Sequence, residues 1–201
     1  MKKNVEIKKI HYKSTDMYKT FCLEGEFMSR IVDIFRRNKE LTIPFELNID
    51  QWQTMDDEVK KIVSGEWKNV KFLNEEGDAL NEAINTVPDD TGGIYIFVLR
   101  PELIPNLHLY VMYIGRARRA NNFSLRKRCK SYIKDPRPLV ATMVELWGKA
   151  LYFYYLPLED DNLIEKVERE LNRVIKAPCN SQYPDEYVRM MPNQNAFSKG
   201  D

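Results

Sequence analysis

The helix predicted over residues 162–175 carries a glutamate on a side where its neighbours are apolar. Glu168 comes four residues after Ile164 and three before Leu171, so the three side chains share one helix face. A carboxylate that faces a protein core is costly unless it is paired with a cation or holds a metal ion. The pattern leaves two interpretations open: an ion pair, for which Arg128 is the candidate partner, and a metal site.

Arg128 also borders an apolar face, in the helix predicted over residues 125–133. It shares that face with Leu125, Cys129 and Tyr132. The planar guanidinium of arginine can hold a phosphate group through two parallel hydrogen bonds. Arg128 is therefore a candidate phosphate ligand.

The segment 116–137 is strongly basic, although the whole chain has a net charge of only +1. It holds a single acid, Asp135, against nine basic residues, which are Arg116, Arg118, Arg119, Arg126, Lys127, Arg128, Lys130, Lys134 and Arg137. Such clustering fits contact with a phosphate backbone, and a merely soluble surface is the alternative. The residues that we predict to contact nucleic acid are Arg116, Arg118, Arg119, Arg126, Lys127 and Lys130.

Two tripeptides stand at the ends of two predicted strands. Gly93-Ile94-Tyr95 opens the strand predicted over residues 94–99, and Tyr113-Ile114-Gly115 closes the strand predicted over residues 109–114. Tyrosine is common in strands, and core packing alone would explain both tyrosines. A chemical role for them depends on the residues further along the chain.

Three polar residues come after the second tripeptide: an arginine in an L-x-x-R setting, a glutamate on a helix and an asparagine twelve residues beyond that glutamate. These are Arg128, Glu168 and Asn180. In this order and on these predicted elements, residues 89–182 resemble the GIY-YIG nuclease superfamily. The layout is most similar to stand-alone members of the restriction-endonuclease type, because the spacing between the two tripeptides is long.

The resemblance implies a metal-dependent endonuclease that hydrolyses phosphodiester bonds in DNA, with RNA as an open alternative. One Mg²⁺, which Mn²⁺ can replace, would be held by Glu168. Arg128 would neutralise charge on the scissile phosphate. Tyr95 would orient and deprotonate the attacking water, with Tyr113 as its hydrogen-bond partner.

Further residues would support this site. Gly115 belongs to the second tripeptide, and Asn180 would brace the site, although a turn residue after a helix is the alternative. Tyr132 stands where many family members carry a histidine, which removes one candidate general base. A free tyrosine has a pKa of about 10, so Tyr95 needs a nearby cation. The candidates for that cation are Arg116, Arg118 and Lys127.

The strands and helices predicted around these candidate site residues indicate an α+β fold. We predict a small three-stranded, mainly antiparallel sheet from residues 94–99, 109–114 and 149–156, flanked by helices as in the GIY-YIG fold. The turn sequence VPDDTGG marks the start of this nuclease core at residues 89–182. Residues 1–88 would form an N-terminal extension, and residues 183–201 a C-terminal tail.

Within the extension we expect a strand over residues 4–12 and helices over residues 26–37 and 50–63, the second capped by Asp50. Residues 115–122 are expected to form a polar basic loop, and residues 139–147 a helix.

Bulk composition narrows the class of protein. Three separated cysteines and two isolated histidines argue against a disulfide framework and against zinc sites. Without a signal sequence or a long apolar run, a cytoplasmic protein without membrane contact, monomeric or homodimeric, is expected. Two alternatives to a restriction or phage-defence enzyme remain open: a catalytically silent nucleic-acid-binding relative, and a repair or structure-specific nuclease.

Overall fold

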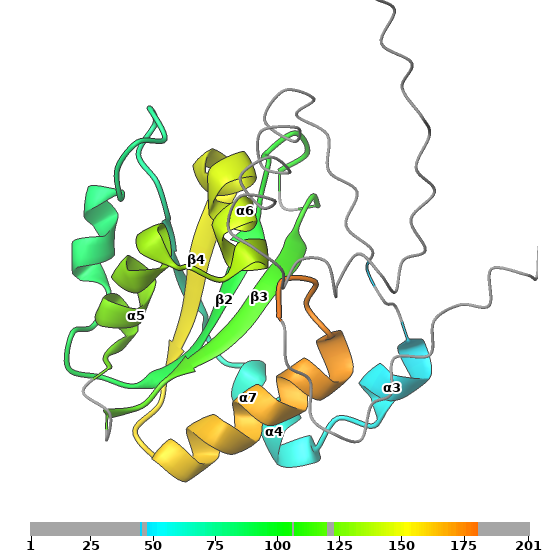
Figure 1. The fold of residues 1–201 in the computed structure, drawn as a ribbon. Helices are drawn as coiled ribbons and strands as arrows, with labels where there is room; N and C mark the ends of the chain where they lie inside the picture. Colours follow the sequence, from blue (N-terminus) through cyan, green and yellow to red (C-terminus); the bar gives the residue numbers. More distant parts are fainter. Residues whose placement is uncertain (1–44, 46–47, 106, 120–122, 181–201) are drawn as a thin grey trace, which may run out of the picture. The chain divides into compact units, whose positions relative to one another are not determined.

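The centre of the fold is an antiparallel sheet of four strands. The computed structural model describes residues 45, 48–105, 107–119 and 123–180, which form one compact unit. The strands are β1 (Lys68–Lys71), β2 (Gly93–Leu99), β3 (Tyr110–Ala117) and β4 (Leu151–Pro157), in the order β1-β4-β2-β3 (Figure 1). The strand predicted over residues 4–12, the helix over 26–37 and the C-terminal tail lie outside the described residues.

The α+β class and the three predicted strands are confirmed, but the count of three is wrong. The fourth strand, β1, pairs with β4 from Lys68 to Lys71. It was missed because its sequence, KNVK, is short and mostly polar, and only Val70 is buried. The segment 48–86, which we assigned to the extension, therefore contributes a strand to the same sheet.

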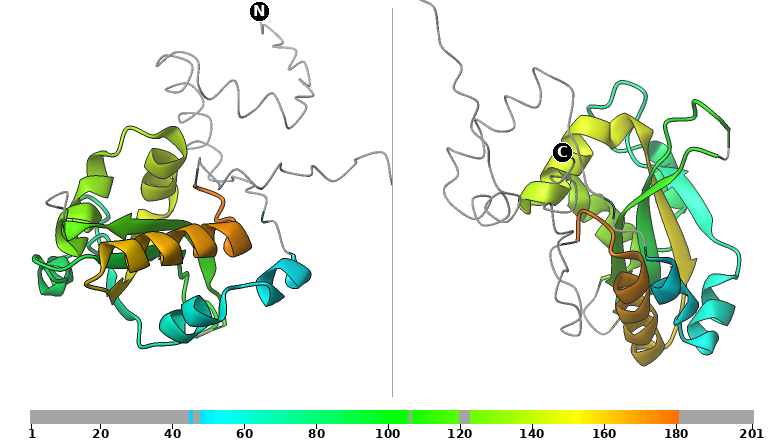
Figure 2. Two further views of the ribbon diagram at one scale, coloured as in Figure 1. Left: turned by 90° about the horizontal axis from the view of Figure 1, so that it is seen from below. Right: turned by 90° about the vertical axis from the view of Figure 1, so that its right-hand side faces the viewer.

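Helices cover both faces of the sheet (Figure 2). On one face lie α5 (Leu125–Ser131) and α6 (Pro138–Trp147), and on the other lie α4 (Asp57–Val63) and α7 (Asp161–Ile175). Strand side chains alternate between faces. Tyr95 and Phe97 of β2 therefore join the core with α5 and α6, whereas Ile94 and Ile96 join the core with α7. Short 3-10 helices complete the described elements, at Glu82–Thr86, Tyr132–Lys134 and Gly148–Ala150.

The predicted helix over residues 50–63 is two helices. The first, α3 (Ile49–Gln53), is capped by Asn48 rather than by Asp50, which lies in its first turn. Asp56 caps α4, because its carboxylate accepts hydrogen bonds from the backbone of Glu58 and Val59. The break between them was hidden because the apolar spacing continues across it.

A β-bulge lies beside the second tripeptide. Phe97 pairs with Tyr113, but Val98 pairs with Val111, so Met112 is an extra residue in β3. A bulge changes the direction in which the neighbouring side chains point. As a result Met112 and Tyr113, although consecutive, both lie in the core with α5 and α6. Strand β3 also runs on to Ala117, three residues into the segment predicted as a loop.

Residues 177–180 lie along the outer side of β3, which is an edge strand. The Asn180 side chain accepts a hydrogen bond from the Ile114 backbone N–H at 2.9 Å and donates one to the Ile114 carbonyl at 2.8 Å. The Cys179 backbone N–H donates to the Met112 carbonyl at 2.9 Å. Asn180 thus satisfies the backbone groups that a neighbouring strand would otherwise pair.

Replacing Asn180 with alanine should lower the free energy of unfolding by about 2–4 kcal/mol, because two buried backbone groups of Ile114 lose their partner. Urea denaturation followed by circular dichroism measures this change. The matched control is Asn162→Ala on the exposed side of α7, which should change stability by less than about 0.5 kcal/mol. Equal effects of the two substitutions would contradict the bracing role.

Candidate active site

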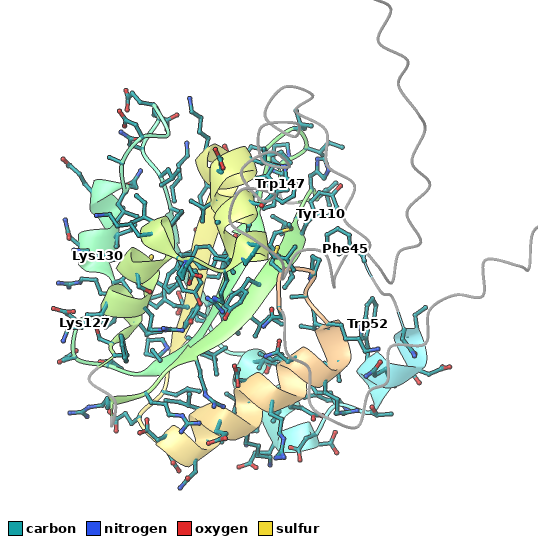
Figure 3. All side chains as sticks on the ribbon, viewed as in Figure 1. Phe45, Trp52, Tyr110, Lys127, Lys130 and Trp147 are labelled. Atoms are coloured by element: carbon teal, nitrogen blue, oxygen red, sulfur yellow. The ribbon has the colours of Figure 1, made fainter. Side chains whose placement is uncertain are left out.

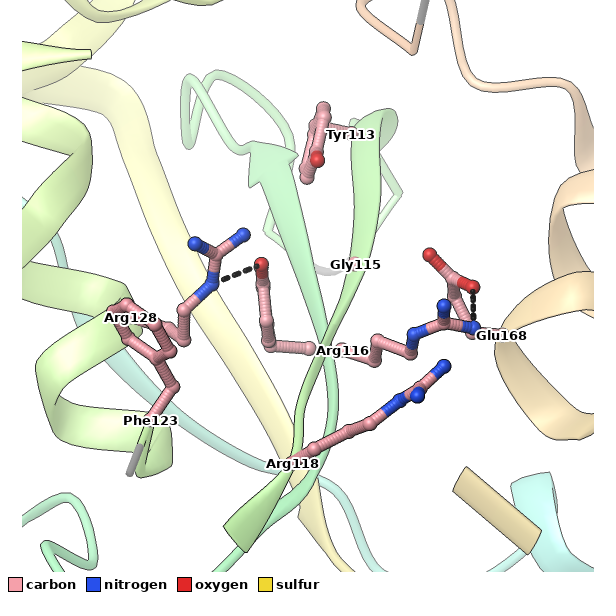
Figure 4. A pocket seen from close by; sticks show the side chains of 8 residues that line it. Tyr113, Gly115, Arg116, Arg118, Phe123, Arg128 and Glu168 are labelled. Atoms are coloured by element: carbon pink, nitrogen blue, oxygen red, sulfur yellow. Dashed lines mark hydrogen bonds and ion pairs between the residues drawn. The ribbon is translucent and has the colours of Figure 1, made fainter. Parts of the chain in front are cut away.

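A pocket of about 340 Å³ opens over β2 and β3, between α5 and α7. It is lined by Tyr95, Tyr113, Gly115, Arg116, Arg118, Phe123, Arg128 and Glu168. Figure 4 shows Arg128 and Phe123 on one side of it and Arg116, Arg118 and Glu168 on the other. The four residues predicted to act directly on a substrate, and Gly115, therefore meet in one place although the chain separates them.

Gly115 lies opposite Tyr95 in the β2–β3 pairing. The Tyr95 ring is fully buried, and a Cβ atom placed on Gly115 would lie 2.5 Å from its Cζ and Oη atoms. No real Cβ contact is that short, and the ring is held by the neighbouring rings of Phe153 and Tyr132. Position 115 must therefore be glycine for the tyrosine to keep its place.

The Tyr95 hydroxyl belongs to a hydrogen-bonded cluster. It lies 2.7 Å from the Tyr132 hydroxyl and accepts a hydrogen bond from Arg128 Nε at 3.3 Å. We expected Tyr113 to be this partner, and that expectation is wrong: the Tyr95 and Tyr113 rings stack, with centroids 6.4 Å apart. Tyr132 instead fixes the Tyr95 hydroxyl.

Tyr113 is held by an arginine that sequence reasoning did not select. Arg137 Nη1 donates to the Tyr113 hydroxyl at 3.0 Å, and its guanidinium carbon lies 5.1 Å from the Tyr113 ring centroid. Asp135 accepts two further hydrogen bonds from the same guanidinium and raises the pKa of Arg137. The spacing D-x-R before a proline-started helix was the available signal.

Glu168 forms an ion pair, but not with Arg128. Arg116 Nη1 donates to Glu168 Oε2 at 2.8 Å, and both side chains are partly exposed, 30% for Arg116 and 23% for Glu168. Among the described residues, nothing donates a hydrogen bond to the other oxygen, Oε1. Burial raises the pKa of the Glu168 carboxyl, and Arg116 and Arg118 offset this only in part. The ion-pair interpretation thus holds with a different partner, and one oxygen stays available.

Burial is the main influence on the pKa of Tyr95 and Tyr132. Desolvation and the nearby Tyr113 raise the pKa of Tyr95, and Arg128 offsets this only in part. Burial likewise raises the pKa of Tyr132. Two of the three cations that we expected to lower the pKa of Tyr95, Arg116 and Arg118, pair with glutamates of α7. The cation that contacts the Tyr95 hydroxyl is Arg128.

Arg128 has the position expected of a phosphate ligand. Its side chain is half buried, and its guanidinium carbon lies 5.5 Å from the Phe123 ring centroid and 5.7 Å from that of Tyr132. Burial lowers the pKa of Arg128, but Tyr95 and Tyr132 outweigh that effect and raise it. Because Nε binds Tyr95, the two terminal nitrogens remain turned toward the pocket (Figure 4). Phe123, which supports this arginine, had no sequence signal.

The predicted nucleic-acid-binding residues differ in their contacts and exposure. Arg116 pairs with Glu168, Arg118 with Glu165 at 2.6 Å, Arg126 with the Val87 carbonyl at 2.7 Å, and Lys130 with Asn85 at 3.0 Å. Arg119, Lys127 and Lys130 are exposed. Lys127 and Lys130 extend outward from α5 (Figure 3).

The carboxylates near the pocket suit some metals and not others. Among the described residues, no three histidine, cysteine, aspartate or glutamate side chains come together as a ligand cluster. Zinc sites need three or four such ligands, whereas Mg²⁺ is often held by one or two carboxylates and several waters. A single partly exposed glutamate with one available oxygen fits the second pattern.

Comparison with known proteins found no match to the chain among family models, curated proteins or solved structures. Of the helices in the described residues, none has the length and apolar character needed to cross a membrane.

The contact between Tyr95 and residue 115 gives a direct test of how the pocket is built. Gly115→Ala should lower the free energy of unfolding by about 1–3 kcal/mol, because the added methyl group overlaps the buried ring. The control is the same substitution in a Tyr95→Ala background, measured by urea denaturation. If the ring is the cause, the two changes should be non-additive by at least about 1 kcal/mol. Additive effects would mean that glycine is needed for another reason.

Proposed function

We propose that this chain is a metal-dependent endonuclease of the GIY-YIG type that hydrolyses phosphodiester bonds in DNA. The observation that supports this is the convergence of Tyr95, Tyr113, Arg128 and Glu168 on one pocket. They come from β2, β3, α5 and α7, and the family resemblance requires all four.

One side of the pocket carries the positive charge that an anionic substrate needs. Arg128 offers two terminal nitrogens at a half-buried position, where a charge-assisted hydrogen bond is stronger than in water. Its contacts with Tyr95 and Phe123 fix the guanidinium before a phosphate arrives. Arg128 would therefore bind the scissile phosphate and stabilise its developing negative charge.

Glu168 would hold a divalent cation, for which Mg²⁺ fits best, with Mn²⁺ as a substitute. When bound, such an ion supplies Lewis-acid stabilisation of the leaving oxygen. The remaining work falls to side chains of this chain. Tyr95, in its phenolate form, would orient the attacking water and accept its proton to become the neutral phenol, and Tyr132 and Arg128 would hold the Tyr95 oxygen in place.

Exposed cations beside the pocket would contact the nucleic-acid backbone. Lys127 and Lys130 extend from α5 (Figure 3). Arg119 comes two residues after the end of β3 at Ala117 and is exposed. Such contacts are insensitive to base sequence and weaken with added salt. We further propose restriction or phage defence as the biological role, because of the long spacing between the tripeptides. Defined cleavage ends would support that role, and cleavage at branched or damaged DNA would favour a repair enzyme.

Purified protein incubated with plasmid DNA and Mg²⁺ should produce nicks or breaks. Glu168→Gln and Arg128→Ala should each reduce the rate at least about 100-fold, because each removes stabilisation of charge at the phosphate. The matched controls are Glu159→Gln and Lys61→Ala, which remove the same charges at exposed positions outside the pocket. Mapping the ends reports specificity. DNA binding without cleavage would favour a catalytically silent nucleic-acid-binding protein. Cleavage that survives both pocket substitutions would contradict the assignment of Glu168 and Arg128 to the active site.

The raised pKa of Tyr95 predicts the pH dependence of cleavage. Below its pKa, the phenolate fraction of a tyrosine grows about tenfold per pH unit. Since the pKa lies above the value of about 10 for a free tyrosine, the rate should keep rising from pH 7 to about pH 9.5. Tyr95→Phe should be slower and should lose this slope. A plateau of the wild-type rate below about pH 8 would exclude Tyr95 as the proton acceptor.

A further inference from the structure

Arg116 occupies the carboxylate on which the proposed metal site depends. Its Nη1 donates to Glu168 Oε2 at 2.8 Å, and both side chains line the pocket (Figure 4). Arginine stays protonated throughout the accessible pH range, so the pair does not open by deprotonation. A divalent cation at Glu168 would have to compete with a fixed positive charge for the same group.

The same guanidinium has a second carboxylate within reach. Glu165 Oε1 lies 3.6 Å from Arg116 Nη1, and Glu165 Oε2 accepts a hydrogen bond from Arg118 at 2.6 Å. Arg116 and Arg118 are both pocket residues. Two arginines and two glutamates therefore form a network in which Arg116 can leave Glu168 without losing every anionic neighbour.

A phosphate group entering the pocket would be a stronger partner for Arg116 than a shared carboxylate. A phosphodiester carries one negative charge shared by two non-bridging oxygens, and these match the arginine fork bidentately. Glu168, with one oxygen released, would then be open to the cation. The charge of the cation would in turn be balanced by the phosphate rather than opposed by Arg116.

We propose that Arg116 couples metal binding to nucleic-acid binding. In the free chain it holds Glu168 and keeps affinity for divalent cations low; a backbone phosphate draws it away and makes Glu168 available. This inference rests on the proposed function for its ligand. Arg116 then has a positioning role at the metal site, in addition to the contact with the nucleic-acid backbone that the sequence predicts. By linkage, the metal should strengthen nucleic-acid binding by the same factor.

The first test measures Mn²⁺ binding to the full chain without DNA, from the electron paramagnetic resonance signal of free Mn²⁺. Arg116→Gln should bind Mn²⁺ about three- to tenfold more tightly than wild type, because the competing cation is gone. The matched control is Arg119→Gln, which removes one exposed positive charge from the same strand end. It should change the affinity by less than about twofold. Glu168→Gln combined with Arg116→Gln should abolish the gain.

The second test adds a short DNA duplex in a Tyr95→Phe background, which slows turnover. DNA should increase the Mn²⁺ affinity of this protein, and the added substitution Arg116→Gln should remove most of the increase. Thermal unfolding by circular dichroism checks that each variant is folded. Equal Mn²⁺ affinity of wild type and Arg116→Gln would overturn the inference, as would an unchanged affinity in the presence of DNA.

Failure of this coupling and failure of the proposed function give different results. Plasmid cleavage by the wild type without any effect of Arg116→Gln on Mn²⁺ binding rejects the coupling and leaves the nuclease proposal intact. Tighter Mn²⁺ binding by Arg116→Gln through Glu168, without cleavage of any DNA by the wild type, keeps Arg116 as a gate on the cation site and rejects the nuclease.

Discussion

The close packing of the Tyr95 ring against Gly115 is the constraint around which the pocket is built. The two residues are cross-strand partners, and there is no room between them for a single carbon atom. Buried rings on the remaining sides hold the tyrosine in one orientation. Its hydroxyl can then reach Tyr132 and Arg128, which belong to the helical layer above the sheet. The absence of a side chain at Gly115 in β3 thus fixes how Tyr95 contacts Arg128 on α5 and Tyr132 just after it.

Charge in the pocket is more balanced than the basic stretch implies. Helix α7 brings Glu165 and Glu168 against Arg116 and Arg118, from about fifty residues further along the chain. Two of the predicted phosphate-binding residues are thereby occupied in the free chain. The positive potential that remains comes from Arg128 inside the pocket and from exposed side chains on α5. Under the proposed function, phosphate binding by Arg116 or Arg118 would require these ion pairs to rearrange.

Local patterns predicted much of the central fold correctly. Apolar alternation located β2, β3 and β4, and helical periodicity located α5, α6 and α7. In long or strongly patterned segments, the local sequence is enough to favour one type of secondary structure. The pattern failed at β1, whose four residues have little apolar character, and at the break between α3 and α4, where capping side chains interrupt a continuous apolar spacing. Both depend on hydrogen bonds that periodicity does not report.

For the candidate site, the sequence by itself determined which residue types carry chemistry and that Glu168 and Arg128 border apolar faces. Only the tertiary structure decided their partners: Glu168 pairs with Arg116, Tyr95 with Tyr132, and Tyr113 with Arg137. The physical reason is that side-chain pairing depends on distances of a few ångströms across elements far apart in the chain. A bulge at one residue, or a glycine beneath a ring, sets those distances, and neither has a periodic signature.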